Sequence, residues 1–172
     1  IKGLQRILNT DVDLVLNTIG KKPKDGTTDS SFSNLEIPFI ISELKHKSTH
    51  AVHISSDAAK LFGTGVSEPL SSEYSRQKRI MEYVASAPNT TVLRTAFFVD
   101  EPNGLMKFLK NAHQNEATVE AYYNNVTNAV PVSVLSKALG DILQCSFHGK
   151  LSLGTKKSFS KGQLIKDLMT SG

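Results

Sequence analysis

Short apolar runs that alternate with helical periodicity constrain the fold of this chain more than any other feature. Three runs lack the polar alternation of a half-exposed strand, as is typical of strands buried on both faces. They lie at residues 12–17, 51–54 and 91–95. Helices are expected between and after them, over about 30–44, 71–87 and 104–115. Strands that alternate with helices of this length predict an α/β fold with a doubly wound (Rossmann-like), mostly parallel sheet.

The last third of the chain is less regular. A strand is expected over 119–123, an amphipathic helix over 132–145 and a short helix over 163–169. Cys145 is expected as a small buried hydrophobe on the apolar face of its helix. Asp29 or Ser30 is expected to cap the first helix.

Composition excludes several classes of protein. The chain is 39% hydrophobic and 21% charged, as globular domains are, and its net charge of +4 is too mild and scattered to predict a nucleic-acid partner. One cysteine excludes an internal disulfide and favours a reducing compartment. No apolar run approaches the roughly 20 residues of a membrane span, and no signal-peptide pattern opens the chain. We therefore expect no membrane partner and a cytoplasmic location.

A tyrosine and a lysine one helical turn apart are the candidate catalytic pair. Tyr74 and Lys78 fall within the helix expected over 71–87, and residues at i and i+4 project from one face of a helix. A nearby ammonium favours the charged form of a phenol, so we expect Lys78 to lower the pKa of Tyr74. Such a phenol suits protonation of the alkoxide that forms when hydride reaches a ketone. Because the spacing also arises by chance, an ordinary surface helix is the alternative interpretation.

Two serines follow the second apolar run at its carboxyl end, where open α/β sheets bind ligands. Ser55 and Ser56 are therefore placed to hydrogen-bond the carbonyl that Tyr74 would protonate. Taken alone, Ser-Ser-Asp is more simply a turn or a helix cap. Together with the helix that carries Tyr74 and Lys78, the ligand-binding interpretation is favoured.

The order of these motifs resembles the extended short-chain dehydrogenase/reductases, and within them the dTDP-4-dehydrorhamnose reductase and sugar-nucleotide-binding branch. The matching segments are residues 13–17, Asn34-x-x-x-Pro38, residues 52–57, Tyr74-x-x-x-Lys78, residues 92–95 and residues 127–131. The resemblance implies a partial dinucleotide-binding core over 1–100 and a small C-terminal substrate-binding lobe over 101–172, joined as one continuous structural unit. It also implies NAD or NADP as cofactor and a nucleotide-sugar substrate, and it is compatible with a homodimer.

The resemblance assigns roles to individual residues. Ser56 would polarise the substrate carbonyl, Tyr74 would donate the proton, and Lys78 would lower the pKa of Tyr74 and hold the nicotinamide ribose. We refer to these three as the catalytic trio. The cofactor contacts of the family are matched by Thr18, Ile19, Gly20, Tyr74 and Lys78. Its sugar-nucleotide contacts are matched by Ser56, Asp57 and Phe97.

Departures from the family pattern bear on this interpretation. The glycine-rich turn that sets a pyrophosphate on a helix N-terminus is absent from the sequence. We attribute this to upstream residues, because the chain opens at Ile1 in the middle of the pattern. Ala58 and Ala59 follow Asp57 where the branch has an aromatic and a β-branched residue, and Gln77 replaces a small residue inside the Tyr–Lys motif. These changes spare the catalytic trio but touch substrate-facing positions.

Other polar residues predict no separate site. The five histidines show no metal-ligand spacing, so no metal is expected. Arg94 lies near the end of the third apolar run, beside the proposed site. Its pattern favours neither of two interpretations, a structural salt bridge or a ligand contact. A basic cluster could meet a diphosphate, but such a cluster is usually a solvated surface. It consists of Lys156, Lys157 and Lys161.

Three functional hypotheses follow. The favoured one is an NAD(P)-dependent reductase, or epimerase, of a 4-keto nucleotide sugar, such as a dTDP-4-dehydrorhamnose reductase-like enzyme of dTDP-rhamnose and surface polysaccharide synthesis. The second is a non-catalytic regulatory or assembly subunit of the same fold, like the regulatory subunit of methionine adenosyltransferase, which Ala58 and Ala59 favour slightly. The third, a purely structural module, does not explain the ordered motifs. The intact catalytic trio favours the enzyme.

Overall fold

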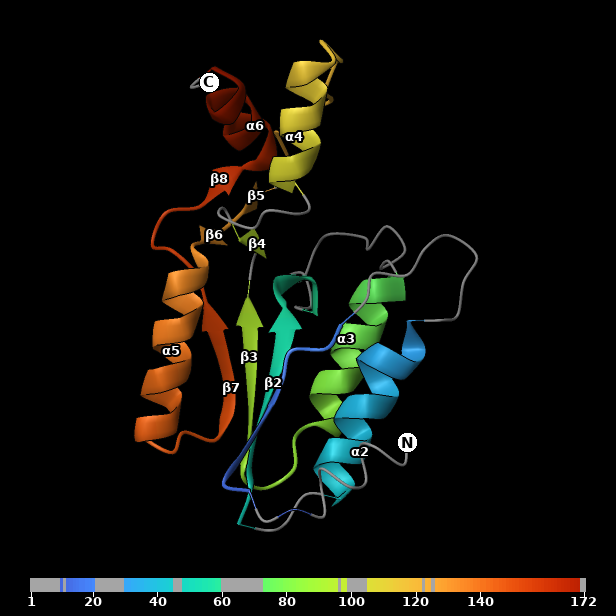
Figure 1. Ribbon diagram of the computed structural model, residues 1–172, viewed down its shortest axis with the longest axis vertical. Coiled ribbons are helices and arrows are strands. Elements are labelled where there is room, and N and C mark those ends of the chain that lie inside the picture. Colours follow the sequence, from blue (N-terminus) through green and yellow to red (C-terminus); the bar gives the residue numbers. More distant parts are fainter. Residues whose placement is uncertain are drawn as a thin grey trace. The chain divides into compact units, whose positions relative to one another are not determined.

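The centre of the structure is a four-stranded sheet with the strand order β1-β2-β3-β7. Its strands are β1 (Leu14–Asn17), β2 (His50–Ser56), β3 (Thr90–Thr95) and β7 (Gly149–Leu153). β1 pairs with β2, and β2 with β3, in parallel, and the arrows of β2, β3 and β7 point the same way in Figure 1. The predicted α/β fold with a parallel sheet is confirmed.

The chain of this computed structural model divides into two compact units. The first comprises residues 1–95 and 142–152, and the second comprises residues 96–141 and 153–172. The structure describes residues 10, 12–20, 30–44, 48–59, 73–95, 97–98, 105–121, 123–124 and 126–170. The functional division near residue 100 stays a prediction; residues 149–153, which fall in the range given to the substrate lobe, form strand β7 in the sheet that begins in the first unit.

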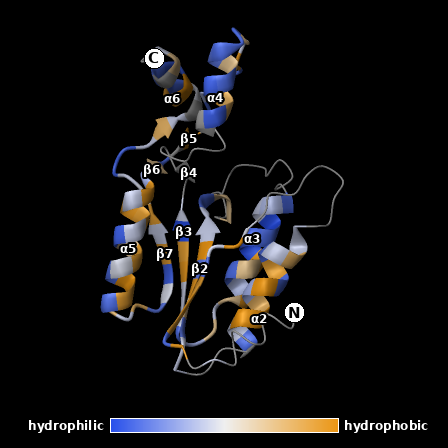
Figure 2. Ribbon diagram, viewed as in Figure 1, coloured by the Kyte–Doolittle hydropathy of each residue, from blue (hydrophilic) through white to orange (hydrophobic). Residues whose placement is uncertain are grey.

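Helices cover the sheet of the first unit and supply its apolar core. A π-helical turn, η1 (Phe32–Glu36), leads into α2 (Ile37–Leu44), and α3 (Glu73–Val84) follows β2 and its short 3-10 turn η2 (Asp57–Ala59). In Figure 1, α2 and α3 lie side by side next to β2. Two apolar clusters join helices and strands, Ile37 and Ile41 with Ala51, and Met81 and Ala85 with Val92. Figure 2 shows apolar residues along β2 and on α2, whereas the upper turns of α3 are polar.

The second unit is built from two-residue strands and helices. β4 (Phe97–Phe98) pairs in parallel with β6 (Ala129–Val130), and β5 (Val126–Thr127) pairs antiparallel with β8 (Phe159–Ser160). Its helices are α4 (Leu105–Gln114), α5 (Val132–Gln144) up to residue 141, and α6 (Lys161–Thr170). Gly162 packs so closely on Tyr123 that a Cβ at this position would lie 2.9 Å from the ring.

Several local predictions are wrong. The strand expected over 119–123 does not form; residues 119–121 lack regular structure, because Glu120 and Ala121 stay exposed without a pairing strand among the described residues. Cys145 is exposed, because it lies just beyond the last residue of α5. Ser30 does not cap the first helix; its hydroxyl donates to Gln77 on α3 instead. Asp29 lies outside the described residues.

Helices form in the segments predicted at about 30–44, 71–87, 104–115, 132–145 and 163–169, with somewhat different ends. Within the described part of the chain, none of them is both long and apolar enough to cross a lipid bilayer.

Candidate active site

The carboxyl end of β1 is joined to the middle of β2 by a buried pair of polar side chains. Asn17 and His53 are register partners on these strands, and Asn17 Nδ2 lies 3.1 Å from His53 Nδ1. Asn17 Oδ1 accepts a hydrogen bond from the backbone N–H of Ile19 at 3.1 Å. The side-chain amide of Asn17 therefore fixes both the end of β1 against β2 and the backbone that follows β1. Thr18 and Ile19 are exposed at this edge of the sheet.

Gly20 brings this segment against α3. A Cβ at Gly20 would lie 3.1 Å from Lys78 Nζ and 3.6 Å from Asn34 Oδ1. The contact with Lys78 is closer than ordinary van der Waals packing, so glycine lets the backbone approach the ammonium. The predicted cofactor-loop residue Gly20 and the predicted catalytic residue Lys78 therefore meet in the structure.

Tyr74 and Lys78 lie on one face of α3, as their spacing predicts. Lys78 Nζ is 5.8 Å from the centroid of the Tyr74 ring. Lys78 is only 5% exposed, and its ammonium donates a hydrogen bond to the backbone carbonyl of Ile54 on β2 at 3.4 Å. The lysine is thus held inside the fold, and the interpretation of α3 as an ordinary surface helix with a solvated lysine is wrong.

Ser56 joins the end of β2 to Tyr74. Its side chain is hydrogen-bonded to Tyr74, and its Oγ donates to Asp57 Oδ1 at 3.2 Å. The same Oγ accepts a hydrogen bond from the backbone N–H of Ala58 at 3.2 Å, within η2. Ser56 therefore stabilises a turn, as the simpler interpretation predicts, and it also contacts Tyr74; its contact with a ligand stays a prediction. The structure brings the whole catalytic trio together.

The electrostatics of Tyr74 are dominated by burial. Burial raises the pKa of Tyr74; the hydrogen bond with Ser56 opposes this, and the charge of Asp57 adds to it. The pKa of Tyr74 is thus raised on balance, whereas the Lys78 ammonium lies over the ring and donates to Ile54. That Lys78 lowers the pKa of this phenol stays a prediction. Burial lowers the pKa of Lys78, and the nearby carboxylate of Glu82 raises it. At neutral pH Tyr74 carries its proton and can act as an acid.

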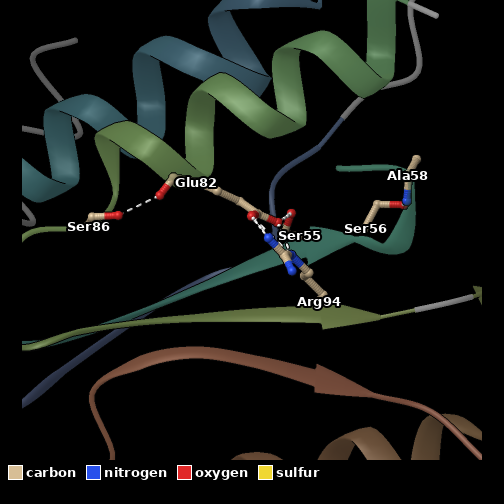
Figure 3. Close-up of polar contacts among 6 residues, drawn as sticks. All are labelled: Ser55, Ser56, Ala58, Glu82, Ser86 and Arg94. Atoms are coloured by element: carbon tan, nitrogen blue, oxygen red, sulfur yellow. Dashed lines mark hydrogen bonds and ion pairs between the residues drawn. The ribbon is translucent and has the colours of Figure 1, made fainter. Parts of the chain in front are cut away.

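Two buried polar networks behind the trio were missed by sequence reasoning. Gln77 Oε1 accepts from Asn34 Nδ2 at 2.7 Å and from Ser30 Oγ at 3.1 Å. Glu82 forms an ion pair with Arg94, with 2.6 Å between Oε2 and Nη2, which decides the open question about Arg94 in favour of a salt bridge (Figure 3). The only sequence signal was the position of these polar residues among apolar ones on the buried face of α3.

Other predicted site residues are placed less fully. Asp57 begins η2 directly beside Ser56. Phe97 lies in β4, opposite Ala129 of β6, and its side chain is outside the described structure. Among the described residues, no group of three or more His, Cys, Asp or Glu side chains is arranged to hold a metal ion.

The fold is that of enzymes that modify nucleotide sugars, and the predicted resemblance is confirmed at the level of the fold. A dTDP-4-dehydrorhamnose reductase from Clostridium acetobutylicum superposes with a TM-score of 0.83 at 14% identity, over 99% of this chain and 66% of that one. The Bacillus anthracis dTDP-4-dehydrorhamnose reductase in complex with NADP superposes with a TM-score of 0.83 at 12% identity, over 99% of this chain and 66% of that one. The Streptomyces venezuelae dTDP-glucose 4,6-dehydratase with NAD and TYD bound superposes with a TM-score of 0.80 at 18% identity, over 99% of this chain and 60% of that one.

The chain thus spans about two thirds or less of the length of these enzymes. No protein-family model and no curated protein matches its sequence. Identities this low establish the common fold and leave the activity to be argued from the site.

Proposed function

We propose that this chain is part of an NAD(P)-dependent oxidoreductase of the short-chain dehydrogenase/reductase type that reduces a 4-keto nucleotide sugar. The observation that carries the proposal is the convergence of Ser56, Tyr74 and Lys78 beside Gly20 at the carboxyl end of the sheet. This edge is where open α/β sheets bind nucleotides. The solved structures with NADP or with NAD and TYD support the same class of ligands.

The described residues fit a dinucleotide at this edge. Thr18 and Ile19 are exposed after β1, and a side chain at position 20 would fill the space in front of Lys78 Nζ. In this proposal, Thr18, Ile19, Gly20, Tyr74 and Lys78 hold the cofactor. The sugar nucleotide is held by Ser56, Asp57 and Phe97.

The chemistry then divides among the trio. A nicotinamide cofactor, held by the residues named above, would supply the hydride for the substrate carbonyl. Tyr74 donates its phenolic proton to the carbonyl oxygen, which becomes a hydroxyl, and the tyrosinate regains a proton from water. Ser56 donates a hydrogen bond to the same oxygen. The positive charge of Lys78 stabilises the tyrosinate while it lasts.

The test follows oxidation of NADH and NADPH by the full-length protein with 4-keto dTDP-, UDP- and GDP-sugars. Tyr74→Phe removes the proton donor and is expected to lower turnover by about 10²–10⁴-fold. Tyr83→Phe is the matched control, because Tyr83 is on the same helix and 84% exposed, and it should keep full activity. Equal activity of the Tyr74 and Tyr83 variants would exclude Tyr74 as the acid.

A regulatory or assembly subunit of the same fold is the second candidate. Ala58 and Ala59 in η2, and a Tyr74 whose pKa burial raises, favour it. This candidate predicts cofactor binding without turnover of any ketone. Placement in dTDP-rhamnose and surface polysaccharide synthesis, a cytoplasmic location and a homodimer belong to the proposal for the enzyme.

A further inference from the structure

Three side chains of α3, each one turn apart, contact the last three residues of β2. Tyr74 is hydrogen-bonded to Ser56, Lys78 Nζ donates to the carbonyl of Ile54, and Ser55 Oγ donates to Glu82 Oε1 at 2.6 Å. Residues four apart share one face of a helix, so these contacts form a single row. Glu82 is the last residue of that row. Its hydrogen bond with Ser55 holds α3 on β2 at the end of the row opposite Tyr74.

The carboxylate of Glu82 is held in place by a guanidinium. Its side chain is 3% exposed, and Arg94 Nε lies 2.8 and 3.0 Å from its two oxygens. Arg94 is the register partner of Ser55 across β2 and β3, so both groups reach Glu82 from adjacent strands (Figure 3). A bidentate guanidinium and a hydroxyl together fix the direction of a carboxylate.

The charge of Glu82 also matters for Lys78, one turn away. Burial raises the pKa of Glu82, but hydrogen bonds from Arg94 and Ser55 hold it below its usual value, so Glu82 is ionised at neutral pH. Burial lowers the pKa of Lys78, and Glu82 raises it again. A buried ammonium needs such an opposite charge to keep its proton.

We propose that Glu82 is a positioning residue of the candidate site, anchoring α3 on β2 and supplying the counter-charge of Lys78, with Arg94 and Ser55 orienting its carboxylate. Its part in catalysis rests on the proposed function, whereas its relation to Lys78 does not. The other ionisable groups that the described structure places around this row are Tyr74 on α3, Asp57 in η2, which acts on Tyr74, and Lys150 on β7, which acts on Glu82. Gly20 faces Lys78 without a charge.

The test measures the protonation midpoint of Lys78 in the full-length protein without cofactor or substrate. Nitrogen NMR of the lysine Nζ atoms gives it, with the Lys78 signal assigned by Lys78→Met. Glu82→Gln leaves the guanidinium of Arg94 unopposed, so the midpoint is expected to fall by about one pH unit. Arg94→Gln leaves the carboxylate unopposed, so the midpoint is expected to rise.

The two variants should shift the protonation midpoint of Lys78 in opposite directions. A purely structural role of Glu82 and Arg94 would shift the midpoint in the same direction in both variants. Asp141→Asn on α5 is the control, because Asp141 is exposed and pairs only loosely with Lys137 at 3.5 Å. If Glu82→Gln does not fold, Glu82→Asp takes its place; it keeps the charge, withdraws it by one methylene, and should give a smaller fall. Midpoints that move together, or do not move, would overturn the proposal.

Turnover then distinguishes this proposal from the proposed function. If the Lys78 midpoint shifts in opposite directions in the two variants but the protein reduces none of the 4-keto sugars, the role of Glu82 is supported and the proposed reductase function is excluded. In an active protein, the pH profile of kcat should move with the Lys78 midpoint in both variants.

Discussion

At the scale of a single residue, Gly20 is the glycine whose lack of a side chain bears on the candidate site. A methyl group there would lie 3.1 Å from Lys78 Nζ, a contact that the buried ammonium relieves by moving a few tenths of an ångström. The φ of Gly20 is outside the left-handed region, so alanine fits the backbone. We expect Gly20→Ala to change the free energy of unfolding by less than about 1 kcal/mol and to weaken NADPH binding about tenfold. Thermal unfolding and NADPH fluorescence titration measure the two effects.

Gly140→Ala is the matched control for this prediction. Gly140 lies within α5, and an added Cβ would meet no atom within 4 Å apart from its chain neighbours and the backbone of its own helix, so alanine should stabilise the protein by about 0.5–1 kcal/mol without changing NADPH binding. If Gly20→Ala binds NADPH as tightly as the wild-type protein, the close approach of the Gly20 backbone to the Lys78 ammonium is not needed for cofactor binding.

At the scale of an element, α3 depends on a buried amide. Gln77 is 2% exposed, accepts hydrogen bonds from Ser30 and Asn34, and donates to Glu73 Oε1 at 2.9 Å. Gln77→Leu removes the acceptor that two buried donors share, so the free energy of unfolding is expected to fall by about 2 kcal/mol. Urea unfolding measures it.

An exposed glutamine provides the comparison. Gln163 on α6 donates to Asp167 one turn later at the surface, so Gln163→Leu should change stability by less than about 0.5 kcal/mol. Similar losses in the two variants would mean that the Gln77 network contributes nothing beyond side-chain hydrogen bonding at a surface.

The same helix shows what the sequence predicts and what it does not. The spacing of Tyr74 and Lys78 is local, so their shared face was predictable, and family resemblance supplied Ser56. The partners of Gln77 and Glu82 lie far along the chain, at Ser30 and Arg94, and no local pattern brings them together. β7 was missed because Lys150 and Ser152 interrupt its apolar residues, and the two-residue strands are too short for any periodicity.

At the scale of the whole molecule, the buried ion pair links stability to acid. The pKa of Glu82 is lower in the folded chain than its usual 4.5: burial raises it, and the hydrogen bonds from Arg94 and Ser55 outweigh burial. Such a carboxyl contributes stability that is complete above its unfolded pKa and is lost as the pH falls through its folded pKa. We expect the free energy of unfolding to decrease below about pH 4.5, measured by urea unfolding from pH 3 to 7.

Glu82→Gln checks the origin of that slope. Because it leaves Arg94 partly buried without its partner, it should lower stability at pH 7 by about 3 kcal/mol and flatten the acid limb. Asp141→Asn, which removes an exposed carboxylate, should leave both unchanged. A Glu82→Gln curve that runs parallel to the wild-type curve would assign the acid sensitivity to other carboxyls.

The return of residues 142–152 to the first unit limits how the chain can be cut into expressible pieces. β3 lies between β2 and β7, and β7 comes from a stretch that follows most of the second unit. A piece that stops at Thr95 would expose the backbone donors and acceptors of β3, the kind of open edge that promotes aggregation. A free-standing first unit therefore needs residues 142–152 grafted after Thr95 through a new linker.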